Sequence, residues 1–281
     1  MNTFKPGLYI VATPIGNLDD ITLRSLDILK KSDIILCEDT RRTLKLLNHF
    51  KIKKKLVPYH KFNEKKELTL VIKYLKEGKI LSLVSDAGTP TLSDPGLLLV
   101  KECIEKKINI YPVPGASSIT ASYSISGFED QFMYYGFLPK KEKELNNVLS
   151  KIQKSDFAII FFIPAVKINF YLESFKKYFS DRKIFIAREM TKIHETFYRD
   201  SVDSIKLFKS NLKGELTVVI SEKIIKDNLI DNAEIKKQAM KYLKKYTLKD
   251  VVELISKKEK ISKNKIYKIC LSLKKIRVII C

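Results

Sequence analysis

Four loops in the first half of the chain combine glycine with proline and small polar residues. They are residues 13–17, 85–90, 93–96 and 113–118, and each falls after a strand candidate. Glycine permits positive φ angles and lets the main chain approach a ligand, whereas proline stiffens a loop. Any one of these loops is equally well explained as an ordinary turn, but four at the strand ends of one sheet predict a shared small-molecule cleft. The sequence has neither a dinucleotide fingerprint nor a phosphate-binding loop, so it supports neither NAD nor ATP.

Three carboxylates and one histidine follow the second and third strand candidates. They are Glu38, Asp39, His60 and Glu64. Carboxylates and imidazoles can accept a proton from a reacting group, so all four are candidates for a general base. Their spacing does not choose among them. An alternative for residues 38–42 is the capped start of a helix with a surface ion pair.

The elements that must position these residues follow an alternating pattern over the first 115 residues. Near-continuous apolar runs, typical of parallel strands covered on both faces, predict strands at Leu8–Ala12, Ile34–Cys37, Leu56–Pro58, Ile80–Ser85 and Ile108–Val113. Amphipathic spacing predicts helices at Thr22–Lys30, Glu64–Glu77 and Gly96–Lys106. Asp19 and Asp20 are capping candidates for the first helix, and Gly78 is expected to end the second. This repeat predicts an α/β sheet with ligands at the carboxyl ends of its strands.

A second α/β unit and a helical tail complete the chain. Strands are expected at Gln131–Gly136, Phe157–Ile163, Ile184–Arg188 and Glu215–Ser221, with helices at Glu142–Lys154 and Lys167–Phe179. After Ser221 the sequence becomes Lys-rich and helical. Two short helices, Thr247–Ser256 and Ser262–Leu273, are expected to flank Lys257–Ile261, a spacing that suits a helix-turn-helix-like unit. We therefore expect two α/β domains, residues 1–117 and 118–221, and a basic helical module at residues 222–281.

The charge of the chain points to a polyanionic partner. The 281 residues include 53 Lys+Arg and 32 Asp+Glu, a formal net charge of +21. Residues 221–281 alone carry 17 basic and 7 acidic side chains. Only 7 of the basic residues are Arg, a skew that an AT-rich genome also produces. A protein of this charge still attracts RNA or DNA.

Cysteine usage and apolar run length indicate a cytoplasmic protein without a metal site. The four cysteines are scattered, which is typical of reduced thiols in the cytosol and gives no zinc-ligand spacing. The longest apolar stretch, Phe157–Val166, is far shorter than the ~20 residues of a membrane helix. No basic-then-apolar leader opens the sequence, so we expect neither secretion nor membrane association.

Several segments, taken in order, resemble the tetrapyrrole-methylase superfamily. They are Val11–Leu18 (VATPIGNL), Cys37–Arg41 (CEDTR), Ser85–Pro90 (SDAGTP) with Ser93–Gly96 (SDPG), Val113–Ser118 (VPGASS), Arg188–Glu195 (REMTKIHE) and Gly214–Thr217 (GELT). Within the superfamily, the chain is most similar to the bacterial cytidine 2′-O-methyltransferases of 16S ribosomal RNA. The resemblance spans essentially the whole chain.

The resemblance implies two α/β domains that enclose S-adenosylmethionine in the cleft between them, a homodimer, no metal, and a cytidine of the 16S rRNA decoding centre as substrate. The residues that it assigns to the cofactor are Pro14, Gly16, Asp86, Ala87, Gly88, Thr89, Pro90, Pro114, Gly115, Ala116, Ser117, Ser118, Glu215, Leu216 and Thr217. Candidate contacts to RNA are Arg41, Arg42, Asn63, Arg188, Lys192 and His194. A ribose hydroxyl is a poor nucleophile, so a positioned base among Glu38, Asp39, His60 and Glu64 would help it react.

One position departs from the family pattern. The family reads His-x-His-Asn-Glu after the third strand, whereas this chain reads His60-Lys61-Phe62-Asn63-Glu64. A role of the second histidine therefore cannot be transferred to Phe62, although His60, Asn63 and Glu64 match.

Two other functions fit parts of the sequence. The chain could methylate a tetrapyrrole or diphthine like other members of the superfamily, although Cys37–Arg41, Arg188–Glu195 and the basic tail argue against a small substrate. It could also be a non-catalytic RNA-binding or ribosome-assembly factor, because no catalytic dyad or triad can be identified from the residues.

Overall fold

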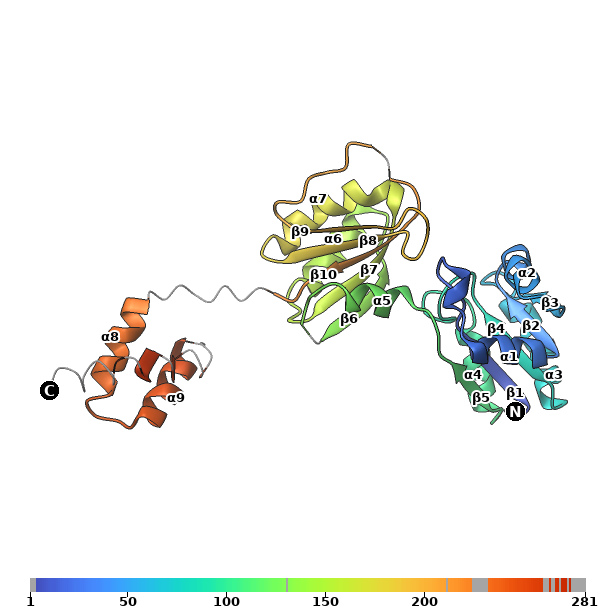
Figure 1. Cartoon of the computed structure of the whole chain (residues 1–281), viewed down its shortest axis with the longest axis horizontal. Coiled ribbons are helices and arrows are strands. Elements are labelled where there is room, and N and C mark those ends of the chain that lie inside the picture. The colour runs from blue at the N-terminus through green and yellow to red at the C-terminus, as the bar shows by residue number, and fades with distance from the viewer. Residues whose placement is uncertain are drawn as a thin grey trace. The chain divides into compact units, whose positions relative to one another are not determined.

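The computed structural model describes residues 4–129, 131–210, 212–223 and 232–259, together with 263, 266, 267, 269–271 and 273. The chain divides into two compact units, Met1–Lys223 and Ile224–Cys281 (Figure 1). The finer division at residues 117/118 and 221/222 stays a prediction.

The first sheet is fully parallel, as predicted. Its strands are β1 (Gly7–Val11), β2 (Ile34–Cys37), β3 (Lys55–Pro58), β4 (Ile80–Val84) and β5 (Ile110–Val113), in the order β3-β2-β4-β1-β5. Successive residues of a strand point to opposite faces, so near-continuous apolar strands build a core on each side. Leu36 of β2 joins the core under α3 (Glu64–Lys76) and α4 (Leu97–Glu105), whereas Ile35 joins the core under α1 (Leu23–Lys31) and α2 (Thr40–His49).

The local signals at helix ends are partly confirmed. Gly78 adopts φ +80° just after α3, as expected for a left-handed terminator. The prediction that Asp19 and Asp20 cap the first helix is wrong. They lie in a 3-10 turn, Leu18–Asp20, and Thr22 caps α1 by accepting the amide hydrogen of Ser25 at 3.0 Å. The intervening turn separates the two aspartates from the helix end that they were expected to cap.

The second sheet is mixed. Its strands are β6 (Phe132–Phe137), β7 (Ala158–Pro164), β8 (Lys183–Arg188), β9 (Thr196–Ser201) and β10 (Glu215–Ile220), in the order β6-β7-β10-β8-β9. Only β6 and β7 are parallel; β10 runs antiparallel to β7 and β8, and β9 antiparallel to β8. Strand β9, which the sequence analysis did not predict, is an edge strand without a buried residue.

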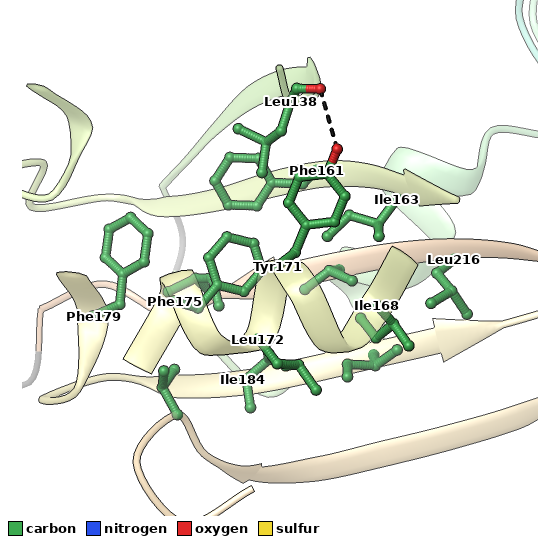
Figure 2. Packing of buried hydrophobic residues seen from close by; sticks show 14 of the residues in the cluster. Leu138, Phe161, Ile163, Ile168, Tyr171, Leu172, Phe175, Phe179, Ile184 and Leu216 are labelled. Atoms are coloured by element: carbon green, nitrogen blue, oxygen red, sulfur yellow. Dashed lines mark hydrogen bonds between the residues drawn. The ribbon is translucent and has the colours of Figure 1, made fainter. Parts of the chain in front are cut away.

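Aromatic side chains fill the core between this sheet and the helices α6 (Glu142–Ile152) and α7 (Ile168–Phe179). Figure 2 shows the part of this core beside α7. The rings of Phe161 and Phe175 stack with their centroids 5.4 Å apart. The Tyr171 hydroxyl donates to the carbonyl of Leu138 at 3.4 Å, which gives this buried polar group a partner. The opposite face packs on α5 (Ser118–Ser124), a short helix that begins at the end of the 113–118 loop.

The C-terminal unit contains α8 (Asn232–Tyr242) and α9 (Leu248–Glu259), drawn in orange to red in Figure 1. Val252, Ile255 and Ile266 are buried and Ile269 is partly buried, which confirms the expected apolar seam. The break expected at Lys257 is wrong, because α9 continues to Glu259. Within the helix expected at Ser262–Leu273, residues 263, 266, 267, 269–271 and 273 are helical, and the others lie outside the described residues. No helix in the described part of the chain is long and apolar enough to cross a membrane.

A buried arginine ties the end of β10 to the connection between α6 and β7. Arg182 is 1% exposed, and its Nη1 donates to the carbonyls of Phe157 and Ser221 at 3.3 and 3.0 Å. Its Nη2 donates to the carbonyls of Gln153 and Ser155 at 2.7 and 2.6 Å. One planar guanidinium therefore satisfies four carbonyls from two segments, which no smaller side chain can do.

We predict that Arg182→Met lowers the free energy of unfolding by about 2–4 kcal/mol, because buried carbonyls lose their donors. Urea unfolding followed by circular dichroism measures the change. The matched control is Arg24→Met at an exposed position of α1, expected within about 0.5 kcal/mol of the unaltered chain. Equal stability of the two variants would contradict this role of Arg182.

Candidate functional site

A partly enclosed cavity, called the main cavity below, is formed by loops from both sheets. It has a volume of about 450 Å³, within the range of roughly 300–1,000 Å³ of small-molecule sites. Its walls come from the loop between β4 and α4 (residues 86–94), the start of α5, the end of β7, and the start of β10 with the loop after β8.

Sheet topology explains the cavity's position. The helix after β1 packs on one face of the first sheet and the helix after β4 on the other, although the two strands are neighbours. Such a switch point leaves a crevice at the carboxyl ends of parallel strands. There the loops are joined by an isolated bridge, in which Thr13 and Gly88 exchange main-chain hydrogen bonds of 2.9 and 3.0 Å. Gly88 adopts φ +77°, a conformation that favours glycine.

The structure brings many of the expected cofactor residues to the cavity. Those that line it are Asp86, Ala87, Gly88, Thr89, Ser117, Ser118, Glu215, Leu216 and Thr217. The remaining ones, which are not among the lining residues, are Pro14, Gly16, Pro90, Pro114, Gly115 and Ala116. These belong to the same loops, and Gly115 packs closely against Ala12, since a Cβ there would lie 3.0 Å from Cβ of Ala12.

The cavity is acidic although the chain is basic. Its lining includes five carboxylates, on Glu38, Asp86, Asp94, Glu189 and Glu215, against two cations, Arg42 and Lys192. Carboxylates in a partly desolvated site favour a positively charged ligand. This composition suits a cation better than a phosphate-rich nucleotide.

Three of these carboxylates have raised pKa values. Burial is the largest cause for each, and neighbouring carboxylates add to it. The pKa of Asp94 is raised to about 6, with Glu38 as the strongest charged neighbour. Asp94 was not among the expected site residues. The motif Ser93–Gly96 contains it, but the motif was noted for its glycine and proline rather than for its carboxylate.

Asp86 fixes the start of α2 beside the cavity. Its Oδ1 accepts the amide hydrogen of Asp39 at 3.1 Å, and its Oδ2 lies 3.4 Å from Nη1 of Arg42. The side chain of Arg42 remains 62% exposed, so its guanidinium is open to solvent at the cavity's edge.

Glu38 and Asp39 are adjacent in sequence but differ in environment. Asp39 caps α2, accepting the amide hydrogen of Arg41 at 2.9 Å, and its carboxylate pairs with the Arg41 guanidinium at 2.6 Å. Hydrogen bonds from Arg41 hold the pKa of Asp39 well below its usual range. The alternative interpretation of a capped helix with a surface ion pair is thus confirmed for Asp39. Glu38 lines the cavity instead, and no described residue forms a hydrogen bond with its carboxylate.

His60, Asn63 and Glu64 shape the entry to α3 and are not among the cavity's lining residues. The Asn63 Oδ1 accepts the amide hydrogen of His60 at 2.8 Å, and Glu64 Oε2 accepts that of Gly96 at 3.3 Å. Nδ1 of His60 is buried and finds no hydrogen-bond partner among the described residues. The charge interaction with His60 lowers the pKa of Glu38, but the burial of Glu38 has the larger effect and raises that pKa. Phe62 is 95% exposed.

Lys192 is held between two carboxylates. Its Nζ lies 3.1 Å from Oε1 of Glu189 and 3.1 Å from Oε2 of Glu215. For Lys192, burial opposes the charged form most strongly, but the two carboxylates together outweigh it and raise the pKa. Thr191 and the loop after β1 meet here, because the Asn17 amide donates to Thr191 Oγ1 at 2.9 Å. A Cβ on Gly16 would lie 2.5 Å from Cγ of Lys192, so only glycine fits this contact.

The other expected RNA contacts lie outside the main cavity. Arg41 pairs with Asp39, and the Nε of Arg188 donates to the carbonyl of Lys213 at 3.0 Å. His194 is exposed and lines a second, more open groove together with His49 and Lys192. Within the described residues, no group of three or more His, Cys, Asp or Glu side chains could hold a metal ion.

Comparison with known proteins identifies the family. Residues 7–206 match the model of the Tetrapyrrole (Corrin/Porphyrin) Methylases. A Thermotoga maritima protein named "Ribosomal RNA small subunit methyltransferase I" is 45% identical over 219 residues, covering 77% of this chain and 98% of that protein. A Buchnera aphidicola protein of the same name is 40% identical over 279 residues, covering 95% of this chain and 97% of that one.

A solved structure supports the fold. The uroporphyrin-III C-methyl transferase of Thermus thermophilus complexed with S-adenyl homocysteine superposes with a TM-score of 0.56 at 14% identity, covering 77% of this chain and 97% of that one. This likeness, with the two sheets described above, confirms the predicted fold class. From the family match and the identity to full-length relatives, the chain belongs to the tetrapyrrole methylase family.

Proposed function

We propose that the chain transfers a methyl group from S-adenosylmethionine to the ribose 2′-oxygen of a cytidine in the decoding centre of 16S rRNA. The observation that carries this proposal is the 40–45% identity to proteins named for methylation of small-subunit ribosomal RNA. The choice of a cytidine and of its 2′-oxygen rests on the resemblance of the ordered motifs. A non-catalytic factor or a methylase of tetrapyrroles or diphthine remains an outcome of the test below.

The acidic cavity fits the proposed cofactor. When bound, S-adenosylmethionine supplies an electrophilic methyl group on a positively charged sulfonium. Asp86 and Asp94 would favour that charge, and the loops around Gly88 and Ser117 would hold the remainder through main-chain groups. Because the reaction is an in-line displacement, precise placement of donor and acceptor supplies much of the rate gain.

Among the four candidate bases, Glu38 is the best supported. It lines the cavity, and its raised pKa brings the carboxylate closer to the operating pH of a general base. Asp39 is held in its ionised form by Arg41, and Glu64 is engaged with the Gly96 amide. His60 would act through Glu38, with which its charge interacts.

The partners follow from the proposed substrate. Arg42, exposed at the cavity's edge, is the candidate contact to an RNA phosphate, since its guanidinium fork matches phosphate oxygens. We also propose a homodimer, as the resemblance implies, and a cytoplasmic location, because small ribosomal subunits are assembled there.

We predict that the protein introduces 2′-O-methylcytidine into small ribosomal subunits that initially lack this modification. The subunits are incubated with the protein and labelled S-adenosylmethionine, then digested with nuclease and analysed by mass spectrometry. Subunits that already carry the modification are the control and should gain no label. Label on a base, or none on subunits from several assembly states with folded protein, would refute the proposal.

We expect Glu38→Gln to lower kcat by about 100-fold, because a positioned base contributes about that factor or more. The affinity for S-adenosylmethionine should change less than about threefold. Asp39→Asn is the matched control, since asparagine is also a good cap and keeps the helix start. A larger loss of kcat in Asp39→Asn than in Glu38→Gln would contradict the assignment of Glu38 as the base.

The carboxylates also predict a pH-dependent preference between cofactor and product. From about pH 5 to pH 7.5 the preference for S-adenosylmethionine over S-adenosylhomocysteine should grow about fivefold, because deprotonation adds negative charge near a sulfonium that the product lacks. Asp94, with a pKa raised to about 6, titrates within this window. Calorimetry of both ligands measures the ratio, and Asp94→Asn should flatten its pH dependence. A ratio independent of pH in the unaltered protein would contradict the prediction.

A further inference from the structure

Three exposed lysines gather at the end of α8. They are Lys241, Lys244 and Lys245, and the exposed Tyr246 follows them. The helical turn continues past the end of α8, because the amides of Lys245 and Tyr246 donate to the carbonyl of Tyr242 at 3.0 and 2.9 Å. Residues three and four apart are neighbours on a helix surface, so Lys244 and Lys245 both lie beside Lys241. We call these four residues the basic turn.

The packing of the unit keeps these lysines in solvent. Ile235 and Ala239 of α8 are buried in its core, and Tyr242 and Leu243, which lie between Lys241 and Lys244 in the chain, pack against that core. The lysines therefore occupy the side of the turn that the core does not use. Lys236, on another side of α8, is exposed but stands apart from the three.

Nearby carboxylates do not neutralise the basic turn. Asp250 accepts a hydrogen bond from the Thr247 hydroxyl at 2.6 Å, and Glu253 pairs with Lys257 at 3.2 Å. No carboxylate among the described residues forms an ion pair with Lys241, Lys244 or Lys245. Like charges three and four residues apart repel by about 0.2–0.5 kcal/mol per pair. A bound polyanion would relieve that repulsion.

We propose that the basic turn is a contact surface for the RNA backbone, an inference that rests on the proposed function for its choice of polyanion. The lysines bind phosphates without regard to sequence. Tyr246 is 52% exposed, and its ring lies against Tyr242 with centroids 6.4 Å apart, which supports it as a platform for an unpaired base.

The relatives support a separate role for this unit. The Thermotoga maritima protein matches 77% of this chain with 98% of its own length, whereas the Buchnera aphidicola protein matches 95% of this chain. The family match ends at residue 206, before the C-terminal unit begins at Ile224. We therefore expect the basic turn to contribute affinity for RNA and to leave the chemical step unchanged.

The test replaces Lys241, Lys244 and Lys245 together with Gln in the full chain. Binding to 16S rRNA transcribed in vitro is measured by filter retention over a range of salt concentrations. The variant should bind about tenfold more weakly at 0.1 M salt, and its salt dependence should be shallower by up to about 2 in the log–log slope, as expected for three lost phosphate contacts. In methyl transfer, KM for RNA should rise and kcat should stay within about twofold.

The matched control replaces Lys236, Lys257 and Lys263 with Gln, which removes the same charge from other exposed positions of the unit. An equal loss of binding in both variants would overturn the assignment to the basic turn, and so would unchanged binding in the first variant. If the lysines only stabilise the helix end, thermal unfolding of the variant will shift while RNA binding stays the same, which also overturns it. RNA binding that depends on the basic turn in a protein without methyl transfer would refute the proposed function alone.

Discussion

The main-chain bridge between Thr13 and Gly88 holds together the two loops on which the cavity depends. These loops leave neighbouring parallel strands, β1 and β4, whose following helices pack on opposite faces of the sheet. Without a link the two loops would diverge, because each leads into a helix on a different face of the sheet. The two hydrogen bonds fix their separation, and the left-handed conformation of Gly88 turns the next residues along the cavity wall. Asp86 and Thr89 lie within two residues of Gly88, so this contact holds their part of the loop beside the loop after β1.

The sequence was sufficient for the parallel sheet because each of its strands is apolar on both faces and each helix has an apolar stripe. It was insufficient for β9, whose residues Thr196–Ser201 are all at least partly exposed and carry no run of apolar side chains. Similarly, helix α8 is Lys-rich and only weakly amphipathic, so no bounds could be assigned to it. The cap of α1 was misplaced because several Asx and Thr residues compete within residues 17–22, and only the backbone conformation decides between them.

The candidate site could be predicted as a set of loops but not as a set of contacts. Sequence reasoning placed Glu38 and Asp39 together, since both follow β2. The two side chains point to different places because Asp39 turns toward the start of α2, where it accepts the amide hydrogen of Arg41. Likewise, Lys192 was expected to meet phosphate, yet Glu189 and Glu215 surround its ammonium. Glu189 is only three residues before Lys192, but Glu215 lies at the start of β10, so no local spacing reveals that the ammonium lies between two carboxylates.

The chain as a whole is basic, whereas its main cavity is acidic. This contrast suits a reaction between a cation and a polyanion. The net charge is +21, but the cavity is lined by five carboxylates and two cations. Exposed lysines attract RNA from a distance set by ionic screening, about 8 Å at physiological salt. The acidic cavity opposes entry of a phosphate and favours a sulfonium. A nucleoside can therefore present its ribose to the cavity only while its phosphates stay outside, near exposed cations such as Arg42. The same field that retains the methyl donor thus limits how far the RNA backbone can approach it.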